Sequence, residues 1–166
     1  MKKLVCFLLC IFLLCGCENE KEVENEIPDF YGFKGQINTI INDVKISAKV
    51  EYESFDKLVL TFLLPETVQN MRIELINGEY VIQYDELTFT VSRENIPYNS
   101  ICNVVMNCAE NIKSATNNNG VYTFASKGQI YNIEIDKDTK CFKKVEVDKT
   151  YILEFENFEY VMGHTE

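Results

Sequence analysis

The sequence has no tryptophan, two arginines and a single histidine, His164, close to its C-terminal end. A zinc site of cysteine and histidine needs about four such ligands, and the cysteines show no CxxC spacing, so no such site is indicated. The GxSxG and HExxH motifs of serine hydrolases and metalloproteases are also absent. We therefore expect a protein without catalytic activity, metal or cofactor.

No apolar run is long enough to cross a membrane as a helix. The run from Leu4 to Leu14 has eleven residues, whereas a spanning helix needs about 20. Lys2 and Lys3 precede it, and Gly16 and Cys17 follow, which is typical of a secretory signal. The segment resembles the lipobox of bacterial lipoproteins, in which cleavage leaves Cys17 at the N-terminus, carrying a diacylglyceryl group. The resemblance implies a lipid anchor on the outer (extracytoplasmic) face of the cell membrane.

The charge left after removal of the signal peptide is strongly negative. Residues 1–16 carry two lysines and no acid, so the rest has 14 basic and 26 acidic residues, a formal charge of −12. This charge disfavours DNA, RNA and anionic lipid headgroups, and we expect no nucleic-acid partner. Residues 17–27 hold the lipidated cysteine and an acidic run that is typical of a tether. A single domain over residues 28–162 and a tail, 163–166, complete the predicted organisation.

Apolar and polar residues alternate along most of the predicted domain, as in Val44 to Tyr52, which indicates half-buried strands. Short turn signals separate these segments, the strongest being Asn77-Gly78. Short connections predict an antiparallel meander. The ten predicted strands cover residues 33–40, 44–52, 58–64, 71–76, 80–84, 87–91, 121–126, 131–135, 142–147 and 151–158.

One stretch has helical spacing instead. Its apolar residues are Ile101, Val104, Val105, Cys108 and Ile112. They predict an amphipathic helix near residues 100–113, capped by residue 99 or 100 and terminated by residues 117–120. Such a helix is about 21 Å long, and ten strands form a sheet about 45 Å wide. The predicted fold is therefore mainly β (α+β): a strongly curved antiparallel sheet, or half-barrel, of about ten strands with one helix on its concave face.

The order of the segments is similar to that of the LolA/LolB-type lipoprotein-carrier fold. The similar segments are Leu63-Leu64-Pro65, then Met71-Arg72-Ile73 leading through Asn77-Gly78 to Tyr80–Tyr84 and Asp85, the helix, and the closing strands. In that family a half-open antiparallel barrel has helices on its apolar concave side. The resemblance covers roughly residues 30 to 160, and it implies a carrier of lipid-modified ligands.

The predicted domain keeps three cysteines, Cys102, Cys108 and Cys141. One disulfide at most can form among them, either Cys102–Cys141 or Cys108–Cys141, and an extracytoplasmic location permits it. The alternative is that the thiols pack as small apolar groups.

Apolar residues occupy both faces of residues 58–64 and 80–84, so neither face of these strands is expected to be wholly solvated. We therefore expect the curved sheet to hold a lipid or another apolar ligand, although a closed core would use the same residues. The alternative is a cell-envelope protein-interaction module that binds a partner by strand addition or charge, with no small-molecule ligand. The candidate lining residues are Leu60, Phe62, Ile73, Leu75, Ile82, Tyr84 and Phe89, with Val105 and Ile112 from the helix as a lid.

Overall fold

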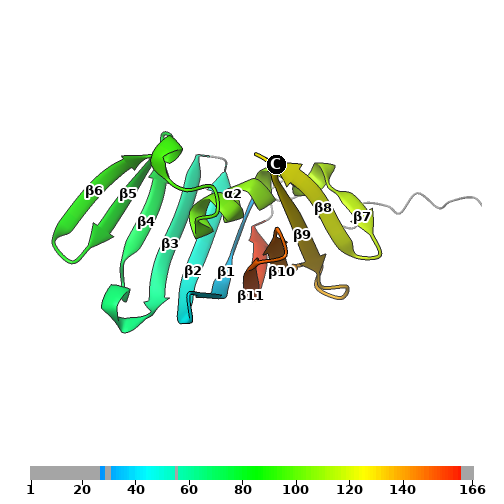
Figure 1. The fold of residues 1–166 in the computed structure, drawn as a ribbon, viewed down its shortest axis with the longest axis horizontal. Coiled ribbons are helices and arrows are strands. Elements are labelled where there is room, and N and C mark those ends of the chain that lie inside the picture. Colours follow the sequence, from blue (N-terminus) through cyan, green and yellow to red (C-terminus); the bar gives the residue numbers. More distant parts are fainter. Residues whose placement is uncertain (1–26, 29–30, 55, 162–166) are drawn as a thin grey trace, which may run out of the picture.

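The computed structural model describes residues 27–28, 31–54 and 56–161. Within them, eleven antiparallel strands form one curved sheet that does not close, and the helix lies on its concave face (Figure 1). The predicted fold class is confirmed. The predicted signal peptide, Cys17, the acidic run 18–26 and the predicted tail 163–166 lie outside the described residues.

The sheet has two halves that meet where the first and last strands pair, in the order β6-β5-β4-β3-β2-β1-β11-β10-β9-β8-β7. One half comprises β1 (Gly32–Ile41), β2 (Val44–Ser54), β3 (Lys57–Leu64), β4 (Arg72–Ile76), β5 (Glu79–Tyr84) and β6 (Leu87–Ser92). The other comprises β7 (Thr116–Asn118), β8 (Val121–Ser126), β9 (Gln129–Ile135), β10 (Phe142–Val147) and β11 (Tyr151–Val161). Short 3-10 turns are η1 (Glu66–Val68), η2 (Arg93–Asn95) and η3 (Ile112–Ser114).

The ten predicted strands are all present, and β7 is the strand that sequence reasoning missed. Thr116–Asn118 contains no apolar residue, so it has no alternation to detect. The residues expected only to terminate the helix also form the β7–β8 turn, in which Asn119 and Gly120 adopt positive φ angles of 55° and 88°. The side chain of Asn117 accepts a hydrogen bond from Gly120 N at 3.0 Å and closes this turn.

The pairing of β1 with β11 is irregular. Their register shifts between Lys34 and Gln36, opposite Asn157, which has a φ of 51°. An extra residue on one strand bends that strand and increases its twist. A glycine accommodates the close approach, because a Cβ on Gly35 would lie 3.2 Å from the Glu156 carbonyl oxygen. The bend helps the sheet to wrap around the helix.

The helix α2 (Ile101–Asn111) begins at Ser100, whose hydroxyl accepts a hydrogen bond from Asn103 N at 3.3 Å. This is one of the two predicted caps, and α2 with η3 covers the predicted range. Residues 101–108 are all buried, which a helix resting on a flat sheet would not achieve. The helix therefore fills the middle of the concave face, and β5 and β6 project beyond its N-terminal end (Figure 1).

The three cysteines of the domain are free, so neither predicted disulfide is found. Cys102 and Cys108 are buried on α2, where they pack as small apolar groups. Cys141 is half-buried, and its thiol donates to the carbonyl oxygen of Phe158 at 3.3 Å. Burial raises the pKa of the Cys102 thiol to about 12 and raises that of Cys108 as well, so both are poor nucleophiles.

Candidate functional site

A row of apolar residues crosses the concave face of one half of the sheet. The residues lie directly opposite one another on successive strands, so their side chains point to the same side. Val50 and Leu60 have no exposed surface, Ile73 and Ile82 are half-buried, and Phe89 is 51% exposed. The apolar face therefore continues past the helix that covers its inner part.

A second pair lies beside the outer end of this row. Tyr84 on β5 is opposite Leu87 on β6, and Leu87 is 56% exposed. The Tyr84 hydroxyl donates to the carbonyl oxygen of Thr67 at 2.8 Å, which ties the end of β5 to the turn η1. We call the surface formed by the outer residues of both rows the outer apolar patch. It consists of Ile73, Ile82, Tyr84, Leu87 and Phe89.

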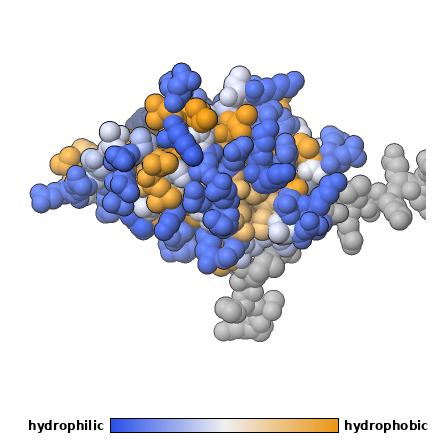
Figure 2. Space-filling model, turned by 90° about the horizontal axis from the view of Figure 1, so that it is seen from below, coloured by the Kyte–Doolittle hydropathy of each residue, from blue (hydrophilic) through white to orange (hydrophobic). Residues whose placement is uncertain are grey.

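Hydrophilic side chains make up most of the face of the molecule drawn in Figure 2. In the view from below, hydrophobic side chains form several separate groups among hydrophilic ones, and one group lies at the end of the molecule where β5 and β6 are (Figure 2). The convex face of the same strand carries Thr88 and Thr90, both exposed. β6 thus has one apolar and one polar face, although both are open to solvent.

The nine candidate lining residues separate into two sets. Leu60, Phe62, Leu75, Val105 and Ile112 belong to the core and are at most 8% exposed. They leave almost no surface for a ligand, because α2 packs directly against the sheet. Val105 and Ile112, which were expected to form a lid, have no exposed surface and belong to the core. The remaining candidates, Ile73, Ile82, Tyr84 and Phe89, are all in the outer apolar patch.

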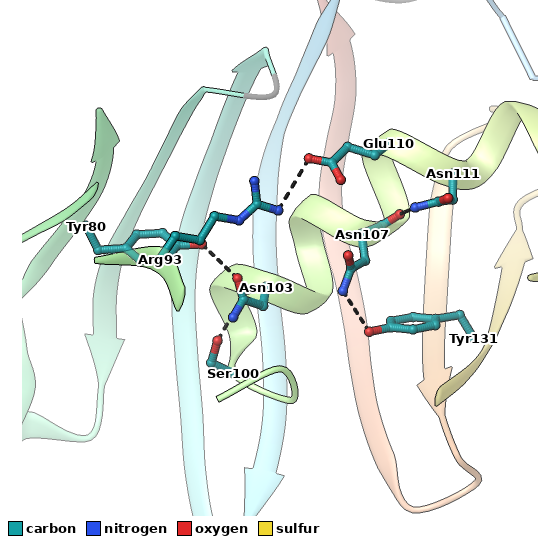
Figure 3. Close-up of polar contacts among 8 residues, drawn as sticks. All are labelled: Tyr80, Arg93, Ser100, Asn103, Asn107, Glu110, Asn111 and Tyr131. Atoms are coloured by element: carbon teal, nitrogen blue, oxygen red, sulfur yellow. Dashed lines mark hydrogen bonds and ion pairs between the residues drawn. The ribbon is translucent and has the colours of Figure 1, made fainter. Parts of the chain in front are cut away.

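Leu87 was not among the candidate lining residues, although its two-residue spacing from Phe89 places both side chains on one face of the strand. Sequence reasoning also missed two buried asparagines that fix the helix in place (Figure 3). The Tyr80 hydroxyl donates to Asn103 Oδ1 at 3.1 Å, and Asn107 Nδ2 donates to the Tyr131 hydroxyl at 2.9 Å. Burial is the main reason that the pKa values of both tyrosines are raised, so their hydroxyls stay neutral.

The edge of the helix carries an ion pair between Arg93 and Glu110, with 3.4 Å between nitrogen and oxygen. Both side chains are about one-third exposed, so the pair contributes little stability. Asn103 Nδ2 also donates to the carbonyl oxygens of Ile96 and Pro97, at 3.1 and 3.0 Å. These contacts hold the loop between β6 and α2, and the position of that loop decides how much of the concave face the helix covers.

The described residues contain few groups arranged for catalysis. One Ser-x-x-Lys sequence spans residues 54–57 at the β2–β3 turn, but the Ser54 hydroxyl donates to Asp56 Oδ1 and Lys57 pairs with Glu53. These contacts do not join the serine to the lysine as nucleophile and base. No group of three metal-ligating side chains occurs among the described residues. Within the same residues, no helix has the length and apolar character needed to span a bilayer.

A shallow pocket of about 470 Å³ lies on the convex side, where the pairing of β1 with β11 ends. Thr39 Oγ1 donates to the Ile152 carbonyl oxygen at 2.6 Å, just beyond the last backbone pair of the two strands, Asn38 and Glu154. Glu154 and Glu156 line the pocket and are exposed. We interpret these carboxylates as a solvated face.

No family model matches the chain, and no curated protein sequence matches it. A solved structure with a similar arrangement is that of an uncharacterized conserved protein from Thermus thermophilus. It has a TM-score of 0.48 and 9% sequence identity, over 80% of each chain. A similarity at this level does not indicate a function.

Proposed function

We propose that this chain is a non-catalytic lipoprotein of the cell envelope, anchored to the outer face of the membrane through Cys17, and that its outer apolar patch binds the acyl chain of a lipid. One observation carries the ligand site: along a single continuous apolar row, exposure rises from 0% at Leu60 to 51% at Phe89. The similarity in segment order to the LolA/LolB-type carriers suggests the same ligand class.

Binding of an acyl chain requires apolar contacts with the outer apolar patch and involves no covalent step. An acyl chain lying across β4, β5 and β6 would contact Ile73, Ile82 and Phe89, and each buried methylene contributes about 0.8 kcal/mol. The acidic domain disfavours anionic headgroups, so we expect affinity to come from the acyl chain. A tether of nine residues spans about 15–18 Å on average, which keeps the domain near the membrane surface.

Binding of a fluorescent fatty acid to the chain lacking residues 1–16 and carrying Cys17→Ala tests this proposal. Phe89→Asp places a charge in the outer apolar patch, and we expect it to weaken binding by about tenfold or more. Thr90→Asp is the matched control, because it adds the same charge to the next residue of β6 on the opposite face. Failure of the unsubstituted chain to bind the probe, or equal weakening by both substitutions, would contradict the proposal.

A second candidate function is a protein-interaction module of the cell envelope that needs no small-molecule ligand. The observation that favours it is the outer edge of β6, which no described strand pairs with. Strand addition at such an edge is a common mode of protein recognition.

A further inference from the structure

The outer edge of β6 lacks the usual protections of an edge strand. Leu87–Ser92 contains no charged residue and no proline, and its pairing with β5 has no bulge. Charged residues, prolines and bulges are the features that normally prevent edge-to-edge pairing of sheets. The opposite edge, β7, is only three residues long. Among the described strands, β6 is therefore the edge best suited to pair with another chain.

The pairing of β6 with β5 determines which backbone groups are available at this edge. Arg93 N donates to the Gly78 carbonyl oxygen at 3.2 Å, just beyond the opposed residues Glu79 and Ser92. In an antiparallel pair, hydrogen-bonded and non-hydrogen-bonded positions alternate. The odd-numbered residues of β6 consequently bond to β5, and Thr88, Thr90 and Ser92 direct their N–H and C=O groups outward.

The sequence of β6 is nearly symmetric about Phe89. Thr88 and Thr90 flank it, and Leu87 and Val91 lie beyond them. Antiparallel pairing with a second copy about Phe89 places Thr88 opposite Thr90, so the outward backbone groups bond to each other. On the concave side, Phe89 then faces Phe89 and Leu87 faces Val91. Along the whole strand, apolar residues of the two copies therefore face each other on the concave side, and threonines face each other on the convex side.

The flanking charges favour this register. Pairing about Phe89 places Glu86, in the β5–β6 turn, nearest Ser92 of the other copy, so no two acidic residues face each other. Pairing about Thr90 instead would bring Glu86 and Glu94 together, and like charges that face each other are destabilising. β6 itself is uncharged, so its pairing brings no like charges together within the strand, although each chain has a formal charge of −10.

We propose that two copies of this chain associate through antiparallel pairing of β6 with β6, with the two-fold axis at Phe89. The pairing sets Leu87 and Phe89, which are 56% and 51% exposed in one copy, beside Val91 and Phe89 of the other copy and makes one continuous sheet from both copies. The outer apolar patches of the two copies become contiguous. The pairing uses backbone groups and does not require a bound ligand.

Cysteine cross-linking of the full chain in membranes tests the partner and the register. In the proposed register the two Phe89 residues form a non-hydrogen-bonded pair with Cα atoms about 4.5 Å apart, within reach of a disulfide. After mild oxidation, Phe89→Cys should yield a disulfide-linked homodimer at least about fivefold above the unsubstituted chain. Thr90→Cys, whose partner is Thr88, should stay at the level of the unsubstituted chain.

Ile130→Cys on β9 is the control for random collision, because Ile130 is 54% exposed and far from β6 in the sheet. No excess cross-linking of Phe89→Cys over Ile130→Cys would overturn the proposal. A product of another mass would also overturn it, since the partner would then be a different envelope protein. Strong cross-linking through residue 90 alone would overturn the register. Fatty-acid binding is measured separately, so each proposal can fail without the other.

Discussion

Asn103 and Asn107 lie one turn apart on α2 and hydrogen-bond to opposite halves of the sheet, Asn103 to Tyr80 on β5 and Asn107 to Tyr131 on β9. Both asparagines are 3% exposed. The helix therefore joins the two halves by polar contacts as well as by packing. Buried amides of this kind stabilise one orientation of the helix, because any rotation would leave them without partners.

Asn107→Ala should lower the free energy of unfolding by about 1–3 kcal/mol, since it removes the donor to the buried Tyr131 hydroxyl. Urea denaturation measures the change. Asn111→Ala is the control: Asn111 is half-buried and its side chain bonds only to the backbone oxygen of Asn107 among the described contacts, so a change within about 0.5 kcal/mol is expected. Equal losses in both variants would show that Asn107 has no special role.

Tyr151→Phe should stabilise the protein by about 1 kcal/mol. The Tyr151 hydroxyl is buried and has no hydrogen-bond partner among the described residues, so removing it relieves a desolvation cost. Tyr80→Phe removes a hydroxyl that is bonded to Asn103, and we expect it to destabilise by about 1–2 kcal/mol. Thermal unfolding of both variants gives the comparison. A loss of stability in Tyr151→Phe similar to that of Tyr80→Phe would contradict the assignment.

Stability should fall as the pH rises above about 9. Cys102 and Cys108 ionise near their ordinary pKa of 9.0 when unfolded, whereas burial raises the folded pKa of Cys102 to about 12 and raises that of Cys108 too. Their contribution is fully present below pH 9 and is lost toward pH 12, with a slope of at most about 1.4 kcal/mol per pH unit for each thiol. Urea denaturation at several pH values under reducing conditions measures the slope.

The double variant Cys102→Ala, Cys108→Ala should show a shallower pH dependence over the same range. Cys141→Ala, which changes a half-buried thiol outside α2, directly before β10, is the control. An unchanged slope in the double variant would mean that other groups, such as the buried tyrosines, cause the loss of stability.

Membrane anchoring through Cys17 predicts that the chain incorporates radiolabelled palmitate in cells. Cys17→Ala should abolish the label and release the protein from the membrane fraction, since a thioether-linked diacylglyceryl group requires this thiol. Cys15→Ala, two residues earlier, is the control and should keep the label. Equal labelling of Cys17→Ala and the unsubstituted chain would exclude the anchor.

The sequence predicts the strands and the helix well because their periodicities are local properties. Ser100 could be identified as a cap for the same reason. The division between core and exposed patch could not be predicted, since Leu60 and Phe89 are both apolar and lie on the same face of the sheet. What separates them is the position of α2, which depends on long-range contacts such as Tyr80–Asn103. Asn103 and Asn107 were missed because the sequence does not show which residues a polar side chain on a mostly apolar helix will contact.

The pairing of β1 with β11 sets an order on folding during synthesis. Gly32 pairs with Val161, so the two halves of the sheet are joined by segments from opposite ends of the fold. Each half is a meander of local hairpins, but the junction between them is among the most non-local contacts in the molecule. The chain cannot complete its sheet until β11 has left the ribosome. A polypeptide that is still unfinished therefore remains without its central strand pair, and its two meanders can form hairpins but cannot yet be joined into one sheet.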